Sequence, residues 1–140
     1  MGAKVVLYVE DEDAAFLLFE TAVKTAGIDV DLHRVSNGEQ AIQFLRRQGS
    51  YAPKPKPDLV VLDLNLPRKN GFDVLSEIKS NDDLRQFAVV VFTSSSLSSD
   101  KRRSLDLGAR DYITKPFTFD SFVEAVKRAC SYVQTMTAGL

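Results

Sequence analysis

Residues 58–67 read DLVVLDLNLP, and this stretch decides the expected fold. Its first half, 58–62, is a short, apolar run rich in leucine and valine, which is typical of a strand buried on both faces of a sheet. Such strands belong to parallel sheets that are covered by helices on both sides. Asp63 follows the run directly, so we expect its side chain at the point where the strand ends.

Similar apolar runs lie on both sides of this stretch. They are found at residues 4–9 (KVVLYV) and 88–92 (AVVVF), with a brief run at 112–113. Residues 30–33 instead alternate apolar and polar side chains, which predicts a half-exposed strand at an edge of the sheet. Amphipathic segments separate these runs. Five strand–helix units predict an α/β fold with a parallel sheet between two layers of helices.

Several residues mark the ends of the expected helices. Asp13 is placed to cap the first helix and Gly27 to end it. Ser36 and Glu39 have the spacing of a capping box, which predicts the start of the second helix. Thr118 is placed to cap the last helix.

Length and composition indicate one globular domain. The chain has 140 residues, of which 44% are hydrophobic and 26% charged, as in ordinary globular proteins. Eighteen basic and nineteen acidic residues leave a net charge of -1, which argues against nucleic-acid or anionic-membrane binding by overall charge and leaves binding by a local basic patch open. The single cysteine, Cys130, excludes an intrachain disulfide. We expect one domain over 1–140, with a core at about 4–133, in the cytoplasm because no signal peptide or membrane span is evident.

Polar residues follow four of the strands, where ligands bind in sheets of this kind. They are Glu10, Asp11, Asp63, Thr93 and Lys115. Three carboxylates resist joint ionisation unless a cation lies among them, and oxygen ligands favour Mg²⁺. A lysine and a hydroxyl complete a pocket suited to a phosphoryl group. The set thus contains the groups that formation of an aspartyl phosphate needs, although acidic residues at strand ends are also common in other α/β proteins.

Four motifs in this order resemble the receiver domain of two-component response regulators. They are VEDE at 9–12, LDLNLP at 62–67 followed by NG at 70–71, FTS at 92–94, and YITKPF at 112–117. The resemblance covers about residues 4–133. It implies a doubly wound (βα)5, flavodoxin-like three-layer sandwich with strand order 2-1-3-4-5.

The resemblance also implies a role for each carboxylate. Asp63 would be the phosphoacceptor, and Glu10, Asp11, Asp63 and the backbone carbonyl of Asn65 would hold Mg²⁺. Glu10 stands where many members of the family have aspartate, so a carboxylate is kept. Asn65 and Ser95, two positions beyond the phosphoacceptor and the switch threonine, would set the lifetime of the phosphoryl group.

Further residues around the pocket are assigned in the same way. Thr93 would bond a phosphoryl oxygen, and Lys115 would pair with the phosphoryl group. Thr93 and Tyr112 would change position together as the switch. The bond between Lys115 and Pro116 is similar to the family's cis peptide, which would aim the lysine into the pocket.

The expected function is that of a stand-alone regulator and not of an enzyme. It would accept a phosphoryl group from a sensor histidine kinase or a phosphotransfer protein, and would signal to a downstream protein target by changing its protein contacts. Seven residues after Val133 are too few for an output domain. The resemblance also implies a homodimer through the fourth helix, fifth strand and fifth helix, and a weaker similarity to the single-domain regulators that serve bacterial phytochromes.

Two alternatives stay open from the residues alone. One is a small-molecule-binding or redox domain of flavodoxin-like fold, although no Ser/Thr/Gly-rich loop follows the first strand. The other is a receiver that acts only as a scaffold. The intact acidic set and Lys115 argue against the scaffold.

Overall fold

The computed structural model describes residues 2–133. The elements, in chain order, are β1 (Lys4–Val9), α1 (Asp13–Thr25), β2 (Val30–Val35), α2 (Gly38–Leu45), a 3-10 helix η1 (Gly49–Tyr51), β3 (Leu59–Leu62), α3 (Gly71–Ser80), β4 (Val89–Thr93), α4 (Ser98–Asp106), β5 (Asp111–Thr114) and α5 (Phe119–Cys130). The five strands form one parallel sheet in the order β2-β1-β3-β4-β5. The predicted fold class and strand order are confirmed.

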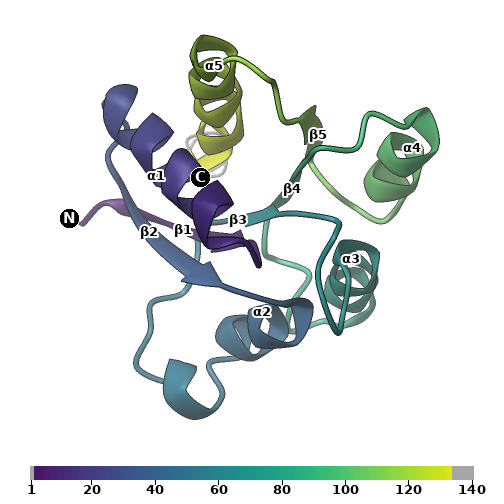
Figure 1. The fold of residues 1–140 in the computed structure, drawn as a ribbon. Helices are drawn as coiled ribbons and strands as arrows, with labels where there is room; N and C mark the ends of the chain where they lie inside the picture. The colour runs from purple at the N-terminus through teal and green to yellow at the C-terminus, as the bar shows by residue number, and fades with distance from the viewer. Residues whose placement is uncertain (1, 134–140) are drawn as a thin grey trace.

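The sheet lies between two layers of helices. Figure 1 shows α1 and α5 together on one face, with α2, α3 and α4 on the other. Within residues 2–133, none of these helices has both the length and the hydropathy that crossing a bilayer requires.

Alternate side chains of each central strand enter different halves of the core. On β1, Leu7 and Val9 pack with the residues of α2 and α3, whereas Val6 and Tyr8 pack with those of α1 and α5. All four side chains are fully buried. Burial on both faces explains why β1 has no polar alternation in the sequence.

The start of α2 differs from the prediction by one residue. Asn37, and not Ser36, is the N-cap, and its side chain accepts a hydrogen bond of 2.8 Å from the backbone N–H of Gln40. The Gln40 side chain in turn accepts from the backbone N–H of Ser36, at 2.8 Å. Because β2 continues to Val35, the helix begins later than the Ser36–Glu39 spacing indicates. Asparagine caps a helix as well as serine does.

Candidate functional site

The carboxyl ends of four strands bring the predicted polar side chains together. Glu10, directly after β1, is fully buried, and so is Thr93 at the end of β4. Asp63, directly after β3, is almost fully buried. Lys115 follows β5, and its Nζ donates to Glu10 Oε1 at 2.8 Å and to Asp63 Oδ2 at 3.3 Å. One ammonium group therefore bridges two carboxylates from different strands.

Backbone contacts fix the position of Asp63. Its N–H donates to the carbonyl of Val9 at 3.2 Å, which extends the pairing of β1 with β3 by one residue. Its Oδ1 accepts from the N–H of Asn65 at 3.3 Å. The N–H of Gly71 donates to the carbonyl of Leu64 at 3.0 Å, so the loop folds back before α3 begins. The sheet and the loop together hold this carboxylate.

Burial and the shared cation set the charges at the site. Burial raises the pKa of Asp63 above its ordinary value, although the charge of Lys115 opposes this shift. Burial acts the same way on Glu10, but the hydrogen bond and charge of Lys115 outweigh it and hold the pKa of Glu10 below its ordinary value. Burial alone would lower the pKa of Lys115, and the two carboxylates raise it instead. Glu10 and Lys115 thus form a charged pair at neutral pH.

An acidic cluster lies beside this pair. Carboxylate oxygens of Glu10, Asp11 and Glu12 are all within 4.8 Å of one another. Asp11 and Glu12 are exposed. Oxygen donors at such close range suit a hard divalent cation. Lys115 contacts both Asp63 and Glu10, and so connects Asp63 to the cluster. Glu12 was not predicted from the sequence as part of this site.

Two further contacts to Glu10 were missed from the sequence. The hydroxyl of Tyr8 donates to Glu10 Oε1 at 3.1 Å. On β2, Arg34 donates from Nε to the backbone carbonyl of Glu10 at 2.9 Å and from an Nη to Asp13 at 2.6 Å. The spacing of Tyr8 and Glu10 is a usable signal, because residues two apart on a strand share a face.

The predicted switch residues meet at the loop between β4 and α4. Tyr112 is buried, and its hydroxyl donates to the carbonyl of Ser95 at 2.8 Å. The N–H of Ser95 lies 3.5 Å from Thr93 Oγ1, which accepts from it. The hydroxyl of Ser95 donates to Asp100 at 2.6 Å, and Asp100 is in the first turn of α4. Ser95 thus connects Thr93, Tyr112 and the start of α4.

The expected cis bond before Pro116 is wrong. Residues 2–133 contain no cis peptide, so the bond between Lys115 and Pro116 is trans. The N–H of Lys115 donates to the carbonyl of Thr93 at 2.7 Å, which continues the pairing of β4 with β5. This backbone contact already brings Lys115 to the strand ends.

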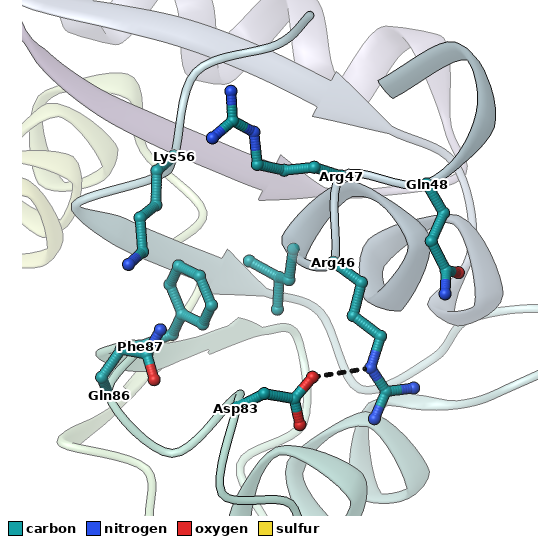
Figure 2. A pocket seen from close by; sticks show the side chains of 8 residues that line it. Arg46, Arg47, Gln48, Lys56, Asp83, Gln86 and Phe87 are labelled. Carbon is teal, nitrogen blue, oxygen red and sulfur yellow. Dashed lines mark hydrogen bonds and ion pairs between the residues drawn. The ribbon is translucent and has the colours of Figure 1, made fainter. Parts of the chain in front are cut away.

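A surface groove lies apart from these strand ends (Figure 2). It is lined by the end of α2, the segment before β3 and the segment before β4. Arg46 pairs there with Asp83 at 3.0 Å and with Glu77 at 3.3 Å. The ammonium of Lys56 lies 5.7 Å from the ring centre of Phe87. The ion pairs of Arg46 link α2 to α3 and to the segment before β4, which is a structural role.

Known proteins resemble the chain over almost all of its length. The model of the response regulator receiver domain matches residues 6–127. Response regulator Rcp1 of Synechocystis sp. is 40% identical over 135 residues, which are 96% of this chain and 92% of that protein. A crystal structure of the Mn²⁺-bound form of Rcp1 has a TM-score of 0.82 and covers 92% of this chain and 93% of its own.

A second solved structure is also similar over almost the whole chain. It is that of the phosphorylated cyanobacterial phytochrome response regulator RcpA, with 35% identity, a TM-score of 0.86 and 95% coverage of both chains. The family model matches most of the chain, and the relatives share its fold over almost their whole length. This chain belongs to the response regulator receiver domain family.

Proposed function

We propose that this receiver takes a phosphoryl group onto Asp63 in a Mg²⁺-dependent reaction. The donor is the phosphohistidine of a sensor histidine kinase or of a phosphotransfer protein. The observation that carries the proposal is the ammonium of Lys115, which lies 2.8 Å from Glu10 and 3.3 Å from Asp63 at the carboxyl edge of the sheet. The match over residues 6–127 supports a single receiver domain over 1–140 with a core at about 4–133.

The chemistry is a displacement at phosphorus. A carboxylate oxygen of Asp63 attacks, an O–P bond forms, and the P–N bond to the donor imidazole breaks. The imidazole nitrogen keeps the electron pair of that bond and then binds a proton. Lys115 and the hydroxyl of Thr93 are assigned to the phosphoryl oxygens, where fixed donors stabilise developing charge. The protein's own part is to hold the nucleophile and these donors in place.

The carboxylates fit a divalent cation. We assign Mg²⁺ to Glu10, Asp11, Asp63 and the backbone carbonyl of Asn65, and the close approach of the carboxylate oxygens of Glu10 and Asp11 supports these two members of the set. Bound Mg²⁺ would offset the negative charge that a phosphoryl group adds beside these carboxylates. Rcp1 has been crystallised with Mn²⁺, an ion with similar ligand preferences.

Exposed apolar side chains near the site support a protein donor. Phe117 and Leu97 lie in the loops that follow β5 and β4, and Leu17 and Leu18 lie in the first half of α1. All four are exposed. Apolar side chains around a charged site are typical of a protein-binding surface. Since RcpA is a phytochrome response regulator, we propose a phytochrome-type kinase as the donor.

We assign the contact that passes the signal to another protein to the face formed by α4, β5 and α5. Ser104 is the only buried residue of α4, so few contacts oppose a shift of this helix. A phosphoryl group that pulls on Thr93 would move Ser95 and, through it, Tyr112 and α4. We propose that this face binds a downstream protein or a second copy of the chain, and that the regulator acts in the cytoplasm without contacting nucleic acid directly.

Incubation with a small phosphodonor tests the proposal. We expect intact mass to rise by one phosphoryl group when Mg²⁺ is present and to stay unchanged when the cation is chelated. The reason is that the incoming anion meets carboxylates that only a cation can offset. A folded protein that gains no mass at any Mg²⁺ concentration would identify a scaffold receiver instead.

The lifetime of the phosphoryl group is expected to depend on Asn65. Hydrolysis needs water in line with the breaking bond, and Asn65, two residues after Asp63, is exposed. The hydroxyl of Ser95 is instead bonded to Asp100. Asn65→Met should therefore slow the loss of the phosphoryl group, and Ser95→Ala should change it little. Decay followed by intact mass after donor removal would contradict this assignment if Ser95→Ala had the larger effect.

A further inference from the structure

Tyr8 is a buried tyrosine in an otherwise apolar layer. Its ring stacks on Phe19 with 4.3 Å between centroids and lies 6.4 Å from Phe92, and its exposure is 0%. A phenylalanine would fill the same space. A hydroxyl in such a layer is costly unless it is hydrogen-bonded, and this one donates to Glu10 Oε1 at 3.1 Å. The hydroxyl therefore serves Glu10 and not the packing.

The two oxygens of Glu10 have different surroundings. Oε1 accepts from both Tyr8 and Lys115, at 3.1 and 2.8 Å. Oε2 accepts from the backbone N–H of Glu12 at 3.2 Å. Each carboxylate oxygen has about two lone-pair sites. Oε1 therefore has two side-chain donors, whereas Oε2 has one backbone donor, and the Asp63 side chain also interacts with this carboxylate.

We infer that Tyr8 is a positioning residue for the divalent cation. By holding Oε1 of Glu10, together with Lys115, the Tyr8 hydroxyl keeps Oε2 of Glu10 on the side of Asp11 and Glu12, the other members of the acidic cluster. This inference rests on the proposed function, in which Glu10 is a metal ligand. Partners that orient a ligating side chain commonly change metal affinity by tenfold or more when they are removed.

The hydrogen bond between Tyr8 and Glu10 depends on the length of the glutamate side chain. Aspartate is one carbon shorter, so its carboxylate would withdraw from Tyr8 by about 1.5 Å. A bond of 3.1 Å does not survive such a change. Tyr8 and Glu10 are thus expected to act as a pair, and Tyr8 should have no partner to orient in a Glu10→Asp background.

The test is a titration with Mn²⁺ alone, in which free Mn²⁺ is measured by electron paramagnetic resonance. Tyr8→Phe keeps the ring and removes the hydroxyl, and we expect it to weaken Mn²⁺ binding by about tenfold. Tyr51→Phe is the matched control, because Tyr51 packs against Phe44 on the other side of the sheet. The Mg²⁺ concentration for half-maximal phosphoryl uptake should rise in Tyr8→Phe, while the rate at saturating Mg²⁺ stays close to that of the wild type.

The Glu10→Asp background identifies the route of the effect. There, Tyr8→Phe should leave Mn²⁺ affinity unchanged. An equal loss in both backgrounds would show that Tyr8 acts by packing, and Mn²⁺ affinity within roughly twofold of wild type in the single variant would also overturn the inference. Glu10→Ala distinguishes failure of the positioning role of Tyr8 from failure of the proposed metal site. If it retains full Mn²⁺ affinity, the proposed metal site itself is wrong.

Discussion

Asp63→Asn is expected to lose all phosphoryl uptake from a small phosphodonor. The amide has nearly the shape of the carboxylate but no charge, and it is not an effective nucleophile. Lys115 keeps Glu10 as a partner at 2.8 Å, so the variant should stay folded. Intact mass with Mg²⁺ and excess donor gives the readout, and thermal unfolding shows that the fold is kept.

Asp106→Asn is the matched control for this loss. Asp106 is an exposed aspartate at the end of α4, and the same substitution there should leave uptake at the wild-type level. Peptide mapping of the wild-type protein should find the phosphoryl group on Asp63. Full labelling of Asp63→Asn on a different carboxylate would refute the phosphoacceptor assignment.

The fold could be predicted because its central strands are buried on both faces. Residues 59–62 and 89–92 are apolar without interruption, and the structure buries every one of them. Parallel order then follows from the helical segments between the strands. The edge position of β2 was visible in the alternation at 30–33 and is confirmed.

The convergence of the candidate site followed from the same reasoning. A parallel sheet brings all strand ends to one edge, so Glu10, Asp63, Thr93 and Lys115 had to meet there. Their chemical roles do not follow from topology and stay proposals. The sequence could not indicate which oxygen each donor reaches, because this depends on side-chain rotamers and on loop closure.

Individual side-chain contacts were not predicted from the sequence. Tyr8 was interpreted as one more apolar residue of a buried run, although its spacing from Glu10 places the two on one face, and the structure shows its hydroxyl donating to Glu10. Arg34 reads as a polar residue on an exposed edge, yet it bonds the carbonyl of Glu10. The shifted cap of α2 has a related cause, since strand length, and not local capping preference, decides where that helix begins.

Gly71→Ala is expected to damage both stability and site geometry. A Cβ at Gly71 would lie 2.6 Å from the backbone carbonyl oxygen of Asp63 and 2.6 Å from the Cα of Leu64. Both atoms belong to the backbone and cannot turn aside as a flexible side chain can. Overpacking of this kind should lower the free energy of unfolding by about 3 kcal/mol, measured by urea denaturation.

Because one of the two crowded atoms belongs to Asp63, the proposed phosphoacceptor, the damage should extend to phosphoryl uptake. A shift of the Asp63 backbone misplaces the nucleophile relative to Lys115, and an error near 1 Å can cost on the order of a hundredfold in rate. Phosphoryl uptake by Gly71→Ala and by the wild type is therefore compared in cool buffer, after circular dichroism has verified that the variant is folded there. Ser76→Ala changes an exposed residue of the same helix. Its free energy of unfolding should stay within roughly 0.5 kcal/mol of the wild-type value, and its rate of phosphoryl uptake should be unchanged. A folded Gly71→Ala with wild-type uptake would mean that the loop relaxes away from Asp63, and that this glycine serves α3 alone.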